Sequence, residues 1–189
     1  MPTSDPRTDF IGFTGSTRTG KRILEVCSAH VKRTQLELGG KSAAIMLPDL
    51  PGLAQIAGIL AASVCFHAGQ GCAIFSRVLV PKSELDAVAD AAIAAMKGVK
   101  YGDPFDAENM MGPLNSAAQR ERVESFIAKG KAEGGRLLVG GGRPGQFEKG
   151  YFIEPTAFIA GENDSIAQDE IFGPVQTIIP YEDEADAVR

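Results

Sequence analysis

Four short segments of this 189-residue chain hold residue types that could carry out chemistry. The first, Phe66–Cys72, runs from a predicted helix through two glycines to a cysteine. Glycines leave little side-chain cover beside Cys72, so its thiol should be reachable, and a thiolate is a strong nucleophile. A buried structural role is nevertheless the commoner one for a cysteine, because Cys is among the residues most often found in cores. The segment alone leaves both interpretations open.

The second segment, Leu36–Lys41, places Glu37 between two leucines at the predicted end of a strand. Apolar neighbours raise the pKa of a carboxyl group by desolvation, as a general base working near neutral pH requires. The alternative is a solvated glutamate at a sheet edge, paired with Lys41. Sequence spacing does not decide between the two.

The third segment, Phe13–Gly20, has a glycine and hydroxyl residues where a predicted strand turns into a predicted helix, with Ser16 or Thr17 as the N-cap. Backbone amides and the helix dipole at such a turn can face a phosphate. The segment is not a GxGxxG motif, so an ordinary capped turn explains it equally well.

The fourth segment, Glu170–Val175, combines a carboxylate with an aromatic side chain in a stretch that leads into a predicted strand. A carboxylate can accept hydrogen bonds from ribose hydroxyls, and an aromatic face can cover a flat ring. This pairing suits a nucleotide. A simple lead-in to the strand is equally consistent with the pattern.

Short apolar runs alternate with longer amphipathic stretches along the chain. Strands are predicted at 10–13, 34–38, 42–47, 77–80, 136–139, 151–159 and 175–181, and helices at 18–31, 53–67, 84–96 and 117–132. Such alternation predicts an α/β fold with a largely parallel sheet and flanking helices.

In content and in order, the segments FTGST, LELGGK, GQGC and EIFGP resemble the NAD(P)-dependent aldehyde dehydrogenase superfamily. The 35 positions that separate Glu37 from Cys72 also resemble the family's spacing, and the segment Gly150–Thr156 is similar to a further family segment. The resemblance covers essentially the whole chain.

The resemblance implies an aldehyde dehydrogenase-like catalytic domain joined to the last part of a Rossmann-like cofactor domain. Residues 1–37 would be the C-terminal part of the NAD(P)-binding domain, and residues 38–189 a C-terminally truncated catalytic domain. Residues 182–189 have the pattern of a first helical turn that stops before it can pack. We therefore expect the chain to be part of something larger.

The same resemblance implies the chemistry. The Cys72 thiolate would attack an aldehyde carbonyl, and the thiohemiacetal would give up a hydride to become a thioester. Glu37 would then activate the water that hydrolyses the thioester, and the backbone N–H of Cys72 would be one oxyanion donor.

The implied cofactor is NAD or NADP, since the strand end that would distinguish them is missing. The implied cofactor-binding residues are Gly15, Ser16, Thr17, Gly20, Leu38, Glu170 and Phe172. Of these, Gly15 and Ser16 would hold the pyrophosphate. Glu170 would bond the nicotinamide ribose, and Phe172 would flank the ring.

Composition argues against several other partners. The net charge of -5 and the absence of a basic run give no reason to expect nucleic acid. The longest apolar stretch, 53–66, is too short and interrupted to span a membrane. Three cysteines without CxxC spacing favour a reducing, cytoplasmic compartment. The expected partners are a small aldehyde and further copies of the chain, because members of the family that it resembles are usually dimers or tetramers.

Three alternatives to an active dehydrogenase remain. A hydrolase could pair Cys72 with His30 or His67, but no third group suggests itself to orient the histidine. A metal site built from Cys65, His67 and Cys72 would lack a fourth ligand, so we expect no metal. The strongest alternative is a truncated family remnant, which would act at most as a pseudoenzyme or an association module.

Overall fold

The computed structural model describes residues 1–189, which form two compact units, Met1–Gly40 and Lys41–Arg189. The predicted domain boundary, between residues 37 and 38, lies three residues before this division. None of the helices combines the length and the apolarity that crossing a bilayer requires.

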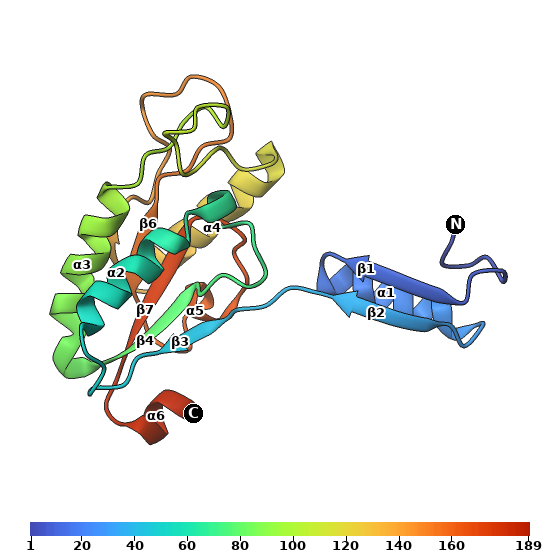
Figure 1. The fold of residues 1–189 in the computed structure, drawn as a ribbon, viewed down its shortest axis with the longest axis horizontal. Coiled ribbons are helices and arrows are strands. Elements are labelled where there is room, and N and C mark those ends of the chain that lie inside the picture. Colours follow the sequence, from blue (N-terminus) through green and yellow to red (C-terminus); the bar gives the residue numbers. More distant parts are fainter. The chain divides into compact units, whose positions relative to one another are not determined.

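The first unit is a single strand-helix-strand motif (Figure 1). It consists of β1 (Phe10–Thr14), α1 (Thr17–Ser28) and β2 (Arg33–Glu37), and the two strands pair in parallel. Ser16 caps α1, as the sequence suggested, because its side chain accepts a hydrogen bond from the Thr19 backbone N–H.

Helix α1 ends at Ser28, so the predicted helix to residue 31 was too long. The chain leaves the helix in a tight turn in which Val31 adopts a left-handed backbone with φ of 50°. The Lys32 N–H bonds back to the Cys27 carbonyl and closes that turn. A β-branched residue such as Val31 carries no local signal for a left-handed backbone. Periodicity alone therefore did not locate the C-terminal end of α1.

The second unit is built on a five-stranded sheet with strand order β3-β4-β7-β6-β5. Its strands are β3 (Ala43–Ile45), β4 (Arg77–Pro81), β5 (Arg136–Val139), β6 (Thr156–Ile159) and β7 (Val175–Tyr181). Its helices are α2 (Leu53–Ser63), α3 (Leu85–Lys97), α4 (Ala117–Ala132), α5 (Ser165–Gln168) and α6 (Glu184–Val188), with 3-10 turns η1 (Phe66–Gly69) and η2 (Lys82–Glu84). Every strand pair is parallel except β5 with β6, so the predicted largely parallel α/β fold is confirmed.

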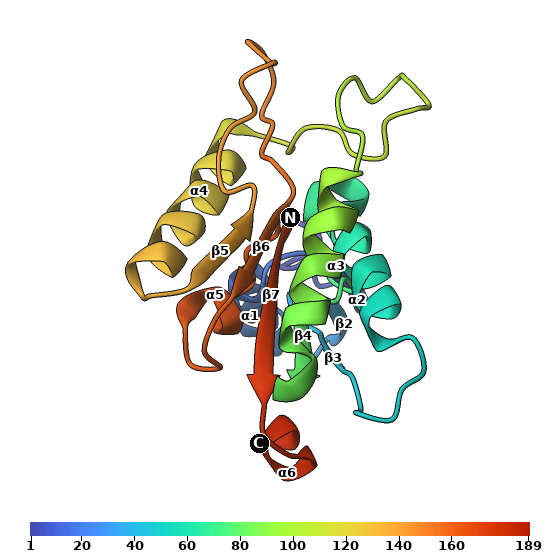
Figure 2. The same ribbon diagram turned by 90° about the vertical axis from the view of Figure 1, so that its left-hand side faces the viewer.

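Helices cover both faces of this sheet. Figure 2 shows α2 and α3 on one side of the strands and α4 and α5 on the other. Helix α3 buries a stripe at Val88, Ala92 and Met96, a spacing that turns one helical face inward. The central strand β7 is buried along almost its whole length, as expected for a parallel strand covered on both faces.

Three further predicted elements were too long. The predicted helix 53–67 stops at Ser63 and gives way to η1. The predicted strand 151–159 is a strand only from Thr156, directly after Pro155, which has no N–H to donate to a sheet ladder. Strand β3 is likewise shorter than the predicted run 42–47.

The topology brings three distant segments to one edge of the sheet. Lys41 immediately precedes β3, Cys72 lies shortly before β4, and the segment Glu170–Gly173 immediately precedes β7. Because β3, β4 and β7 are parallel neighbours, their amino ends lie at the same edge.

Candidate active site

The cysteine segment forms a backbone turn of unusual conformation. His67, Ala68 and Gly69 have φ values of 50°, 53° and 73°, so three consecutive residues are left-handed. Each of the two non-glycine residues costs about 1–2 kcal/mol in this region. Such strain persists only where surrounding contacts hold it, and it is concentrated at functional sites. We call residues 66–72 the nucleophile turn.

Contacts within the second unit hold this turn. A Cβ built on Gly69 would overlap the Gly173 carbonyl and lie 2.5 Å from the Pro174 nitrogen, so only glycine allows the two backbones to touch. The Gln70 amide donates to the His67 carbonyl at 3.1 Å, and its oxygen accepts from the Asn115 N–H at 3.1 Å. The turn is thus fixed both internally and from outside.

Cys72 is exposed, whereas Cys27 and Cys65 are buried, with exposed fractions of 1% and 0%. Burial raises the pKa of the Cys65 thiol to about 12, which keeps it protonated at neutral pH. Cys72 is therefore the thiol that a small electrophile can reach, as the sequence predicted. The structure brings together no group of three or more His, Cys, Asp or Glu side chains that could hold a metal ion.

The segment Glu170–Pro174, which we call the aromatic segment, meets the nucleophile turn through Gly173. Phe172 has φ of 61°, a second left-handed position at a bulky residue. Its carbonyl accepts a hydrogen bond of 2.7 Å from the Gln119 side-chain amide. No motif or spacing in the sequence singles out Gln119.

Lys41 lies at the same sheet edge, and its buried amine has no hydrogen-bond partner. Burial lowers the pKa of Lys41 to about 8, and the charge of Arg77 adds to this. Asp169 and Glu170 act in the opposite direction. The sequence suggested Lys41 only as a partner for Glu37 and did not predict its place near the aromatic segment.

The first unit gathers the remaining predicted residues around the start of α1. The Gly15 N–H donates to the Glu37 carbonyl at 3.0 Å, which ties the turn before the helix to the end of β2. A Cβ on Gly20 would lie 2.7 Å from Leu38 Cδ2, so these two residues pack on one another. The Glu37 side chain is exposed in this unit, which matches the solvated one of the two interpretations that the sequence left open.

The predicted residues thus fall into two sets. Cys72, Glu170 and Phe172 lie in two segments that approach each other at one edge of the second unit. The other set, at the start of α1 and the end of β2 in the first unit, comprises Gly15, Ser16, Thr17, Gly20, Glu37 and Leu38.

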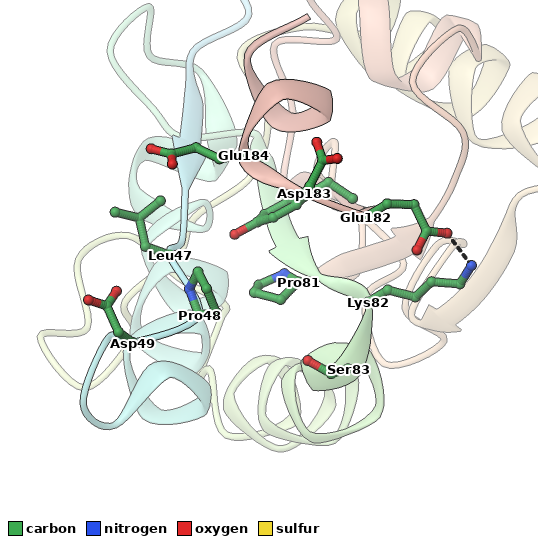
Figure 3. Close-up of a pocket in the computed structure, with 10 residues that line it drawn as sticks. Leu47, Pro48, Asp49, Pro81, Lys82, Ser83, Glu182, Asp183 and Glu184 are labelled. Carbon is green, nitrogen blue, oxygen red and sulfur yellow. Dashed lines mark hydrogen bonds and ion pairs between the residues drawn. The ribbon is translucent and has the colours of Figure 1, made fainter.

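A depression of about 740 Å³ lies away from these residues (Figure 3). It is lined by residues that follow β3, β4 and β7, among them Asp49, Ser83 and Glu184, and Lys82 pairs there with Glu182. It therefore sits at the carboxyl edge of the sheet, opposite the nucleophile turn. No predicted site residue lines it.

Comparison with known proteins decides the family. The model of the aldehyde dehydrogenase family matches residues 2–189. The chain belongs to the aldehyde dehydrogenase family. It is 44% identical over 187 residues to a geranial dehydrogenase of Castellaniella defragrans, covering 98% of this chain and 38% of that one.

Solved aldehyde dehydrogenases share the fold. One from Mycobacterium tuberculosis, complexed with NAD+, has a TM-score of 0.93 and 44% identity, with 98% of this chain and 38% of that one covered. Aldehyde dehydrogenase C of Pseudomonas syringae, complexed with NAD+ and octanal, has a TM-score of 0.95 and 34% identity, with 98% and 39% covered. The chain thus spans well under half the length of the relatives it matches.

Selective alkylation tests the assignment of the reactive thiol. Brief iodoacetamide treatment of the folded chain should label Cys72 well before Cys27 or Cys65, because only Cys72 is exposed. Peptide mass spectrometry reads the site, and the denatured chain, in which all three cysteines should react, is the control. Earlier labelling of Cys27 or Cys65 would refute the assignment.

Proposed function

We propose that this chain contributes the thiol and the hydrolytic base to the NAD(P)-dependent oxidation of an aldehyde to a carboxylic acid. The observation that carries the proposal is the exposed Cys72 at the end of a strained turn, fixed against the aromatic segment. NAD+ and an aldehyde in the Pseudomonas syringae relative support the choice of cofactor and substrate class.

The thiolate of Cys72 begins the reaction by attacking the carbonyl carbon of the aldehyde. A carbon–sulfur bond forms, and the carbonyl oxygen takes up the electron pair as an oxyanion. The backbone N–H of Cys72 is one donor that stabilises this charge. Loss of a hydride from the thiohemiacetal carbon then leaves a thioester on Cys72.

Glu37 acts in the second half of the reaction. Its carboxylate removes a proton from water, and the resulting hydroxide attacks the thioester carbonyl. The carbon–sulfur bond breaks, the carboxylic acid leaves, and Cys72 is regenerated as a thiolate. Glu37 occupies the end of β2, where its exposed side chain is free to meet water.

The chain's residues fit a nicotinamide dinucleotide. When bound, the cofactor supplies the hydride acceptor. The first amides of α1 have no partners within the helix, and a pyrophosphate beside Gly15 and Ser16 would satisfy them. Glu170 and Phe172 would hold the nicotinamide ribose and ring. Both NAD and NADP suit these residues, and we propose a homo-oligomer as the assembled form.

A family remnant without oxidation activity is the second candidate. The chain spans 38% of the length of the geranial dehydrogenase. Such a remnant would fold but hold no cofactor. Cofactor binding therefore separates the two candidates.

The role of Glu37 can be tested without cofactor by acylating Cys72 with p-nitrophenyl acetate. Glu37→Gln should leave acylation intact and slow hydrolysis of the thioester by about 10²–10⁴-fold, because only hydrolysis needs a base for water. Intact mass should show the acyl form accumulating. Glu25→Gln, a matched change on α1, should behave as the parent chain. Equal hydrolysis rates in both variants would remove Glu37 from the mechanism.

Cofactor binding can be measured by titrating the chain with NAD in a calorimeter. We expect weak binding that Phe172→Ala abolishes, because this ring would cover the nicotinamide. Phe105→Ala is the control, since Phe105 is 97% exposed and belongs to neither segment of the site. No heat at millimolar NAD, or an equal effect of both variants, would favour the remnant.

A further inference from the structure

The start of helix α4 holds the aromatic segment through its backbone. Gln119 donates from its side-chain amide to two consecutive carbonyls, those of Ile171 at 3.0 Å and Phe172 at 2.7 Å. Arg122 donates to the Glu170 carbonyl at 2.5 Å. Two side chains one helical turn apart therefore bind three successive carbonyls of the aromatic segment.

These hydrogen bonds flank Phe172, whose left-handed backbone conformation is unfavourable for a residue with a bulky side chain. Phe172 is left-handed, with φ of 61°, at a cost of about 1–2 kcal/mol. The carbonyls on both sides of its N–Cα–C unit are the two that Gln119 binds. Gln119 thereby fixes the peptide planes that determine where the Phe172 ring points.

Helix α4 also packs so closely against Gly173 that a side chain at that position would not fit. A Cβ on Gly173 would overlap the Val123 side chain, and Gly173 is fully enclosed. Immediately before the helix, the Asn115 N–H donates to the Gln70 side chain in the nucleophile turn. One stretch of nine residues, 115–123, thus contacts both parts of the site.

Gln119 is itself set by the helix cap. Its backbone N–H donates to the Ser116 side chain at 3.1 Å, which places it in the first turn of α4. Its side-chain amide has two N–H donors, and both are used on the aromatic segment. Another side chain of this length, such as Met, could fill the space but could not bind the carbonyls.

We propose that Gln119 is a positioning residue, which holds the Phe172 backbone left-handed and so keeps its ring beside the nucleophile turn for a nicotinamide. The role of Phe172 toward a nicotinamide rests on the proposed function. The positioning of Phe172 by Gln119 can be measured on the chain without cofactor. Gln119 acts through the backbone of the aromatic segment.

The chain has no tryptophan, so Phe172→Trp introduces a single fluorescent reporter at this position. In that background, Gln119→Met should lower the fluorescence anisotropy of the reporter, because the ring is freed from its fixed backbone. Gln168→Met is the matched control. It removes a glutamine bond to a backbone carbonyl, that of Glu162 at 2.6 Å, outside the site, and should leave the anisotropy unchanged.

Gln119→Glu adds a pH signature that a packing role would not give. Its carboxylate would repel the two carbonyls at neutral pH, whereas its protonated form, which prevails below the ordinary glutamate pKa of about 4.3, can donate one hydrogen bond. The anisotropy should therefore recover as the pH falls, and the Gln119→Met variant should show no such recovery. Circular dichroism checks that each variant is folded.

Hydrogen exchange with Phe172 left in place covers the case in which the tryptophan variant fails to fold. Gln119→Met should speed amide exchange across residues 171–175 by about tenfold, in line with the loss of two hydrogen bonds. Unchanged exchange and anisotropy in Gln119→Met, or equal changes in Gln168→Met, would overturn the proposal. Failure to bind NAD would count against the proposed function and leave these readouts unaffected.

Discussion

The candidate site depends on the contact between the Gly69 backbone and the Gly173–Pro174 peptide. This contact joins the turn that ends in Cys72 to the segment that carries Phe172, two stretches about a hundred positions apart in the sequence. Only a residue without a side chain permits this approach, and the left-handed φ of 73° at Gly69 favours glycine as well. The strain at His67 and Ala68 is tolerated because this contact and the Gln70 bonds hold the turn.

Sheet topology explains why these segments meet. Ligands of open α/β sheets commonly lie at the carboxyl ends of the strands. Here the exposed Cys72 and the aromatic segment instead precede β4 and β7, so the proposed site lies at the amino edge. The carboxyl edge has an open depression of about 740 Å³, and none of the family's motif residues lines it (Figure 3).

Much of this arrangement could be predicted from the sequence. The four motifs identified the family, alternating apolar and amphipathic stretches gave the α/β class, and Ser16 marked the start of α1. The break between α2 and η1 could not be predicted, because the apolar pattern continues through it and left-handed His67 and Ala68 have no local signature. Gln119 was missed since its role arises from a tertiary contact 52 positions away in sequence. For Glu37 the sequence left a desolvated and a solvated carboxylate both open, and strand alternation leaves the side chain exposed.

Backbone contact with the aromatic segment locks the nucleophile turn. Comparing Gly69→Ala with Gly145→Ala tests it most directly, because a Cβ on Gly145 meets nothing within 4 Å. We predict that Gly69→Ala lowers the free energy of unfolding by about 3 kcal/mol. It should also change the alkylation rate of Cys72, whereas Gly145→Ala should alter neither quantity. Equal stability and equal Cys72 reactivity in the two variants would show that this contact does not hold the nucleophile turn.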